Sequence, residues 1–206
     1  MIGIIDYGVG NIQAFLNLFK RLQIKAKRVV KAKDFDGCSC IILPGVGHFD
    51  HAMQRFNDSG LRPPLERLVV NDKAPVLGVC VGMQMLADSS EEGLLPGLGW
   101  IPGKVRSMQS NQSFAQLRTP HMGWNTLDVS QNSMLFSAGF DEAPQFYFLH
   151  SYYFEACNRE DVVATAKYGA DFDVVVSRGN IHGVQCHPEK SHHWGQQIIK
   201  NFIGNQ

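Results

Sequence analysis

The chain has 206 residues, 44% of them hydrophobic, which is enough to bury the core of an ordinary globular protein. Its 19 basic and 19 acidic residues balance, so its composition favours neither nucleic acid nor an anionic membrane as a partner. No apolar run reaches the roughly 18 residues of a membrane span, and the first residues do not read as a signal peptide. We therefore expect one domain over residues 1–206, located in the cytoplasm.

The first half of the chain alternates between strand and helix patterns. Strands are predicted over residues 2–7, 25–30, 38–45 and 74–80, and an amphipathic helix over 11–22 has Asn11 as a suitable N-cap. Residues 49–72 hold two helices separated by a Gly-Leu-Arg-Pro-Pro break, and a further helix is predicted over 82–87. This alternation predicts an α/β fold with an open, mostly parallel sheet flanked by helices.

The second half of the chain has a different pattern. After Ser89, short strand-like stretches are separated by Gly, Asn, Pro and Asp, and a last amphipathic helix is predicted over 192–204. These strands predict an antiparallel section added to the sheet. The five cysteines are odd in number and include no Cys-x-x-Cys pair, which indicates reduced thiols rather than a disulfide framework.

A cysteine stands between two glycines where a predicted strand meets a predicted helix, in Gly78-Val79-Cys80-Val81-Gly82. A residue at the apex of such a turn is strained and exposed to the site, and its flanking glycines avoid clashes. The following helix N-terminus favours a thiolate, and the amide of Val81 can point at a developing oxyanion. Cys80 is a candidate nucleophile, although a buried cysteine in a tight turn also fits.

A thiolate nucleophile needs a base and a group that orients the base, and residues 183–191 contain both. His187 ends a strand-like run, and Glu189 follows two residues later. His187 could move a proton between Cys80 and a leaving group while Glu189 fixes its tautomer. Taken alone, His-Pro-Glu also fits a solvated turn, but both segments end strands where open α/β sheets hold their sites.

A glycine-rich loop ends another predicted strand, in Ile-Leu-Pro-Gly-Val-Gly-His-Phe. The backbone amide between Val46 and Gly47 could turn inward and complete an oxyanion hole, although a plain turn would have the same residues. The loop matches neither a dinucleotide-binding nor a Walker motif. His48 and His51 have no third ligand nearby in the sequence, so we expect no metal and no cofactor.

Together these motifs resemble the class I (triad) glutamine amidotransferases. Within that class, the sequence is similar to the glutaminase subunits of imidazole glycerol phosphate synthase. The resemblance spans nearly the whole chain, and the opening block and Pro-His-Met-Gly-Trp-Asn are more specific than the triad. The blocks occur in this order: IIDYGVGNIQ, LPGVGHF, GVCVGMQML, SSEEGLLPGLGWIPGKV, PHMGWN, FYFLHSYYF and GVQCHPEKS.

The resemblance implies that Cys80 attacks the carboxamide of glutamine and that His187, oriented by Glu189, protonates the departing ammonia. Water then hydrolyses the thioester to glutamate. The implied oxyanion-hole residues are Val46, Gly47 and Val81. The implied glutamine-binding residues are Gly47, Gln84, Glu92, Ser151 and Tyr152. Glu92 also fits an ordinary loop, and Ser151 and Tyr152 also fit positions in the sheet and core.

The resemblance also implies a partner, because in this family the ammonia travels to a separate (β/α)₈ cyclase subunit and the two subunits form a heterodimer. This chain is too short to contain such a barrel itself. The expected interface residues, which could equally lie in the core, are His121, Met122, Gly123, Trp124, Asn125 and Tyr147.

The destination of the ammonia has two interpretations. One is histidine biosynthesis, where the cyclase makes imidazole glycerol phosphate and AICAR, the purine precursor. The other is amidination of a surface-polysaccharide sugar, because residues 166–195 look closer to a second-copy version of this subunit.

Cys186 stands where relatives usually carry an aromatic residue, and strand alternation predicts that it faces away from His187. Rival classes are DJ-1/PfpI-like proteins, γ-glutamyl hydrolases and non-catalytic binding subunits, and the last should lack one of Cys80, His187 and Glu189.

Overall fold

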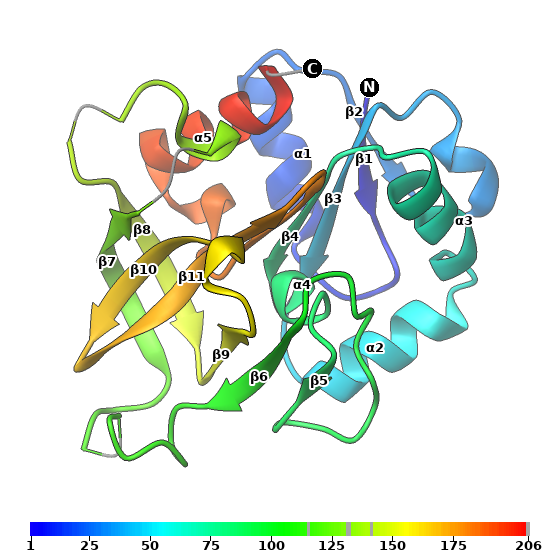
Figure 1. Ribbon diagram of the computed structural model, residues 1–206. Helices are drawn as coiled ribbons and strands as arrows, with labels where there is room; N and C mark the ends of the chain where they lie inside the picture. Colours follow the sequence, from blue (N-terminus) through cyan, green and yellow to red (C-terminus); the bar gives the residue numbers. More distant parts are fainter. Residues whose placement is uncertain (115, 131–132, 141, 205–206) are drawn as a thin grey trace.

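The computed structural model describes residues 1–114, 116–130, 133–140 and 142–204 (Figure 1). Its first half alternates strands and helices as the sequence predicts. The elements are β1 (Ile2–Ile5), α1 (Ile12–Arg21), β2 (Ala26–Val29), η1 (Ala32–Phe35), β3 (Cys40–Gly45), α2 (Phe49–Asp58), α3 (Arg62–Glu66), η2 (Arg67–Asn71), β4 (Val76–Cys80) and α4 (Val81–Gln84).

The second half consists mainly of strands and ends in one long helix, again as predicted. Its elements are β5 (Ser89–Ser90), β6 (Gly103–Ser107), β7 (His121–Val129), η3 (Met134–Phe136), β8 (Gln145–His150), β9 (Tyr152–Ala156), η4 (Arg159–Asp161), β10 (Val162–Tyr168), β11 (Ala170–Arg178), β12 (Ile181–Val184), η5 (Pro188–Lys190) and α5 (His192–Gly204).

One large sheet runs through both halves, in the order β2-β1-β3-β4-β12-β11-β10-β7-β8. The first five strands in this order are mutually parallel, and β12 pairs with β4 although about a hundred residues separate them. From β11 onward the pairings become antiparallel, and β9 and β6 branch off beside β11. The predicted α/β fold with an antiparallel section is therefore confirmed.

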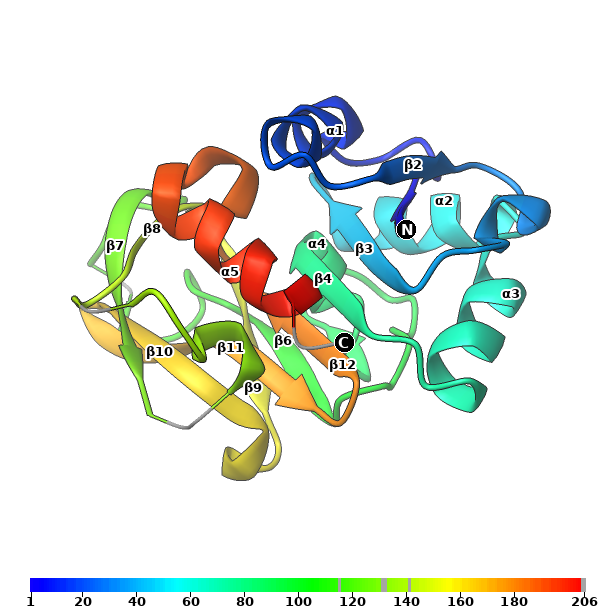
Figure 2. The same ribbon diagram turned by 90° about the horizontal axis from the view of Figure 1, so that it is seen from above.

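Helices cover both faces of the parallel section: α1 and α5 lie on one side and α2 and α3 on the other (Figure 2). Helix α1 begins as predicted, because the side chain of Asn11 accepts a hydrogen bond from the amide of Ala14. The strands between the helices are almost wholly buried, which explains their near-continuous apolar sequence.

Two predicted helices differ in length from the structure. The helix predicted over 82–87 is the shorter α4, which begins at Val81 and ends at Gln84, after which the chain turns toward β5. The helix after the Pro-Pro break begins at Arg62 with the prolines in its first turn, where a missing N–H costs nothing. Beyond Glu66 it continues as a π-helical turn.

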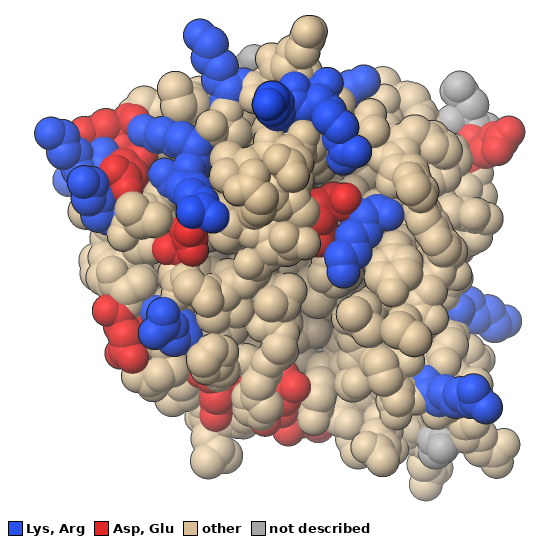
Figure 3. Space-filling model, turned by 180° about the vertical axis from the view of Figure 1, so that it is seen from behind, with Lys and Arg blue, Asp and Glu red and all other residues tan. Residues whose placement is uncertain are grey.

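Charged side chains of both signs are mixed on the surface. On the face shown in Figure 3, Lys and Arg gather along the top and upper left, with Asp and Glu between them, while uncharged side chains cover most of the middle. Within the described ranges, no helix is long and apolar enough to cross a membrane.

Candidate active site

Cys80 lies at the junction of β4 and α4, with backbone angles φ 55° and ψ −113°. Few residues with a side chain adopt a positive φ, so this conformation is strained and persists only because the surrounding structure imposes it. The side chain is 4% exposed. The strand therefore ends in the sharp turn that the sequence predicted, with the sulfur at the carboxyl edge of the parallel strands.

The glycines on either side of Cys80 are required by close backbone contacts. A Cβ atom on Gly78 would lie 2.6 Å from the carbonyl oxygen of Gly82, and one on Gly82 would overlap the carbonyl oxygen of Leu43. Gly45 at the end of β3 is equally crowded, since its Cβ would lie 2.5 Å from the amide nitrogen of Gly82. The turn around Cys80 is thus packed directly against the neighbouring strand β3.

His187 and Glu189 lie beside Cys80, because β12 pairs with β4 in parallel and both strands end at the same edge. The imidazole Nδ1 of His187 is 2.9 Å from Oε1 of Glu189, and both side chains are at most 5% exposed. The remaining imidazole nitrogen, Nε2, is available for the hydrogen bond between His187 and Cys80. The structure thus brings together the three residues predicted to form the triad.

The electrostatic surroundings of His187 favour its protonated form. Burial alone lowers its pKa, but hydrogen bonds to Cys80 and Glu189, and the negative charges of both, raise the pKa to about 10. His187 is therefore held as an imidazolium beside the Cys80 sulfur, an arrangement that activates a cysteine as a nucleophile.

A cavity of about 350 Å³ opens at Cys80, a size that suits a small polar metabolite. Its lining includes every predicted oxyanion-hole and glutamine-binding residue. The lining residues are Val46, Gly47, Cys80, Val81, Gln84, Glu92, Pro120, Leu149, His150, Ser151, Tyr152, His187 and Lys190.

The loop after β3 borders the cavity at Val46 and Gly47. Gly47 has a φ of +80°, and a Cβ there would meet nothing within 4 Å, so the conformation rather than space selects glycine. Val46 is 40% exposed, and both residues face the cavity beside Cys80 and Val81. The next residue, His48, caps α2 by accepting a hydrogen bond from the amide of Asp50.

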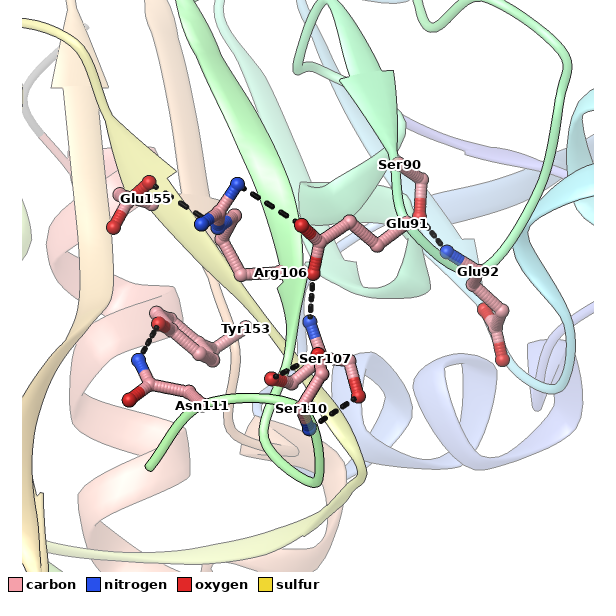
Figure 4. A network of polar contacts seen from close by, with 9 residues as sticks. All are labelled: Ser90, Glu91, Glu92, Arg106, Ser107, Ser110, Asn111, Tyr153 and Glu155. Carbon is pink, nitrogen blue, oxygen red and sulfur yellow. Dashed lines mark hydrogen bonds and ion pairs between the residues drawn. The ribbon is translucent and has the colours of Figure 1, made fainter. Parts of the chain in front are cut away.

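The two adjacent glutamates after β5 have different roles. Glu91 bonds to Arg106 and accepts a hydrogen bond from the amide of Ser107, whereas Glu92 points away from that pair (Figure 4). Oε2 of Glu92 accepts a 2.8 Å hydrogen bond from the amide of Phe49 at the start of α2. Burial raises the pKa of the Glu92 carboxyl, and the Phe49 amide opposes this shift. Glu91 thus anchors the loop, and Glu92 lies at the cavity.

The residues predicted at the partner interface lie on β7, where they alternate between its two faces, and at Tyr147 on β8. Met122 and Trp124 are 66% and 47% exposed. The half-buried Tyr147 on β8 lies opposite Trp124 in the pairing of β7 with β8. By contrast, His121 is only 3% exposed and packs inside the sheet, because successive side chains on a strand point to opposite faces. His121 is therefore removed from the predicted interface.

Gly123 and Asn125 complete this group. Gly123 adopts a φ of +135°, and a Cβ there would meet nothing within 4 Å. Asn125 is half-buried, and its side chain donates to the carbonyl of Lys167 and contacts Nε2 of His121. Its side chain is thus used within the sheet.

Cys186 is completely buried, and burial raises the pKa of its thiol well above the ordinary value. It is therefore a protonated core residue and does not compete with Cys80 as a nucleophile.

Among the residues that the structure describes, no group of His, Cys, Asp or Glu is arranged to hold a metal ion.

Sequence reasoning missed two polar residues beside the nucleophile. Gln185 is completely buried and lies near the sulfur of Cys80, and His150, the last residue of β8, lines the cavity. Gln185 stands two residues before His187, so strand alternation could have placed both side chains on one face.

Known proteins match the chain over nearly its full length. The family model of the class-I glutamine amidotransferases matches residues 4–205. The imidazole glycerol phosphate synthase subunit HisH of Bdellovibrio bacteriovorus is 54% identical over 202 residues, which cover 98% of each chain. Subunit HisH 2 of Pseudomonas aeruginosa is 44% identical over 204 residues, again 98% of each chain. A solved structure of a glutamine amidotransferase, 21% identical, superposes with a TM-score of 0.74 over 98% of this chain and 97% of that one.

Proposed function

The chain belongs to the class I glutamine amidotransferases and, within them, to the HisH subunits of imidazole glycerol phosphate synthase, and we propose how its residues perform the glutaminase reaction. As an enzyme of histidine biosynthesis, it releases ammonia from glutamine. The observation that carries the proposed mechanism is the geometry at Cys80: a strained cysteine, hydrogen-bonded to a His187–Glu189 pair, at the base of a small cavity.

In the first step, the thiolate of Cys80 attacks the side-chain carbonyl carbon of glutamine. The C–S bond forms as the carbonyl π electrons move to oxygen, giving a tetrahedral oxyanion. The amide of Val81 at the start of α4 and the amide between Val46 and Gly47 stabilise this charge. The imidazolium of His187 then protonates the nitrogen, the C–N bond breaks, and ammonia leaves a thioester on Cys80.

In the second step, the now neutral His187 takes a proton from water as the water oxygen attacks the thioester carbon. The C–S bond breaks, glutamate leaves, and the thiolate–imidazolium pair is restored. Glu189 keeps its hydrogen bond to Nδ1 throughout, so Nε2 always faces the reacting atoms. No cofactor is needed for either step.

Glutamine itself is held by polar groups around the same cavity. We assign the amino group to the carboxylate of Glu92, which lies at the cavity with one oxygen bonded to the Phe49 amide. Gln84, Ser151, Tyr152 and the backbone of Gly47 supply the remaining contacts. The entire chain acts as one glutaminase domain.

The ammonia passes to a partner with a (β/α)₈ cyclase barrel, and the two subunits form a heterodimer. The face that meets the barrel is formed by Met122, Trp124, Tyr147 and Leu149 on β7 and β8, with Val46 on the loop after β3. Four of these side chains are large, apolar and more than a third exposed. Leu149 and Val46 also line the cavity, so a barrel docked there covers the cavity mouth.

Glutamate release from glutamine tests this function. The purified chain should release little glutamate alone and much more when the histidine-pathway cyclase barrel and its nucleotide ligand are added. A chain that stays inactive with that barrel but is activated by the barrel of a surface-polysaccharide gene cluster would move the acceptor to a sugar. A chain inactive with both barrels would contradict the proposed function.

A further inference from the structure

Gln185 donates a hydrogen bond to the nucleophilic sulfur. Its Nε2 is 3.7 Å from Sγ of Cys80, within the range for a donor to sulfur, and the side chain is completely buried. It lies directly after β12, and its backbone amide donates to the carbonyl of Val174 on β11. The donor is therefore built into the sheet, separately from His187.

The orientation of the Gln185 amide follows from its neighbours. Nε2 of Gln84 donates to the carbonyl of Tyr152 at 3.0 Å, which fixes the Gln84 amide because a carbonyl only accepts. The same Nε2 donates to Oε1 of Gln185 at 3.1 Å. Gln185 must therefore present its oxygen to Gln84 and its N–H₂ group to Cys80.

We propose that Gln185 is a catalytic residue of the glutaminase reaction: it holds the Cys80 sulfur in its thiolate form and stabilises the same thiolate as the leaving group when the thioester is hydrolysed. Hydrogen bonds to a charged acceptor are stronger than those to a neutral one, so the donor favours the thiolate over both the thiol and the thioester. This inference rests on the proposed role of Cys80 as the nucleophile. It gives the Cys80 sulfur a second hydrogen-bond donor, Gln185, in addition to His187.

Other charged or titratable groups lie near this sulfur or line the cavity beside it, and Gln185→Leu replaces none of them. They come from the segment after β1, the loop after β5, strands β8 and β9, and the segment around η5. These groups are Tyr7, Glu92, His150, Tyr152, Cys186, His187, Glu189 and Lys190. A change in the titration of Cys80 in a Gln185 variant therefore reports the loss of this one donor.

The experiment measures the rate at which iodoacetamide alkylates Cys80 as a function of pH, read from the Cys80 peptide by mass spectrometry. Gln185→Leu should move the midpoint of the profile to higher pH and slow alkylation at neutral pH about tenfold, the loss expected for a hydrogen bond to a charged group. Gln185→Glu should move it further, because a carboxylate replaces the donor. Gln145→Leu, an exposed matched control on β8, should leave the profile unchanged.

Gln84→Leu provides a second variant that leaves Gln185 in place. It removes the contact that orients the Gln185 amide, so the midpoint should move in the same direction by a smaller amount. Unchanged midpoints in folded Gln185→Leu and Gln84→Leu would overturn the proposal. Because alkylation needs neither glutamine nor a barrel, its result is independent of the glutamate-release assay, where failure of the wild-type chain would instead count against the proposed function.

Discussion

At the scale of single residues, the site depends on backbone strain held by close packing. Cys80 adopts a positive φ, and the turn that contains it touches the backbone of β3 at Gly45 and Leu43. Such strain costs about 1–3 kcal/mol and persists only where neighbouring contacts fix the conformation. The glycines of the turn therefore contribute to stability and to the placement of the sulfur.

Gly82→Ala tests this packing. The added Cβ would overlap the carbonyl oxygen of Leu43, which is backbone and cannot move aside cheaply, so the free energy of unfolding should fall by about 3 kcal/mol or more. Urea denaturation followed by circular dichroism measures the change. Gly204→Ala is the control, because a Cβ at Gly204 meets nothing within 4 Å. Equal stability of the two variants would contradict the packing argument.

The sequence could predict the residues whose role is written in a local motif. Cys80 with its glycines, and His187 with Glu189, occur in short patterns with a physical reason for each position. The donor role of Gln185 could not be predicted, because it depends on which strand lies beside β12 and on the orientation that Gln84 imposes. His121 was placed at the predicted interface because the sequence does not show which of the two alternating faces of β7 is covered, and in the structure His121 is on the covered face.

At the scale of elements, β7 and β8 are joined by a pair of buried histidines. His121 and His150 are directly opposite in the register, and Nδ1 of His121 lies 2.9 Å from Nε2 of His150. Nδ1 of His150 faces the carbonyl of Tyr152, so it carries the proton, and Nε2 must accept from His121. Nε2 of His121 then accepts from Asn125. One neutral tautomer of each imidazole ring therefore satisfies every hydrogen bond in this series.

These histidines should make the stability of the protein depend on pH. Burial lowers the pKa of His121 to about 4, and burial together with the neighbouring His121 lowers that of His150 to about 3. In the unfolded chain both histidines bind protons near the ordinary pKa of 6.5. Their contribution to the free energy of unfolding is therefore complete above pH 6.5. It is lost as pH falls toward about 4, with a slope of up to about 1.4 kcal/mol per pH unit for each ring.

His121→Phe removes one of the two titrations while keeping an aromatic ring among Phe148, Tyr168 and Phe172. The free energy of unfolding, measured by urea denaturation across that acidic range, should therefore depend less steeply on pH than in the wild-type chain. Replacing the exposed His51 by Gln should leave the slope unchanged. A variant with the full wild-type slope would show that His121 does not titrate in this way.

The loop that carries Glu92 is held by its neighbour. Glu91 bonds to Arg106 at 2.9 Å and to the amide of Ser107 at 2.9 Å (Figure 4). Glu91→Ala removes both contacts, so the KM for glutamine should rise several-fold with a smaller change in kcat, because the role proposed for Glu92 is to bind substrate without reacting. Glu155→Ala removes only a longer, 3.5 Å contact of Arg106 and should have less effect. Steady-state glutamate release distinguishes these outcomes, and a lower kcat at constant KM would contradict the assignment.

At the scale of the whole molecule, the sheet brings the cavity and the exposed face of β7 and β8 together. The parallel strands β3, β4 and β12 end at the cavity, while the antiparallel section places Leu149 at its rim and Met122 opposite Leu149 on β7. This arrangement could be anticipated as an α/β sheet with an antiparallel section. The strand order could not be predicted, because it depends on long-range pairings, such as that of β12 with β4, which no local sequence pattern contains.

Met122→Asp tests the proposed docking face. An aspartate in the centre of an apolar interface should weaken association with the cyclase barrel tenfold or more, about 1.4 kcal/mol, because its charge must be desolvated. Its thermal unfolding should match the wild type, since Met122 is 66% exposed in the isolated chain. Val70→Asp is the control: it replaces an exposed apolar residue in η2, which continues from α3, and Figure 1 shows α3 on the side of the molecule away from β7 and β8. Calorimetric titration should show weaker binding for Met122→Asp alone; equal weakening in both variants would place the interface elsewhere.

The most direct measurement of the central claim is glutamate release by the chain assembled with its cyclase barrel, compared between the wild type and Cys80→Ala. If the thiolate at the β4–α4 junction is the nucleophile, the substitution should lower the rate about a thousandfold or more, to background, while binding to the barrel is retained. A Cys80→Ala chain that still releases glutamate at a rate comparable to the wild type would contradict the account.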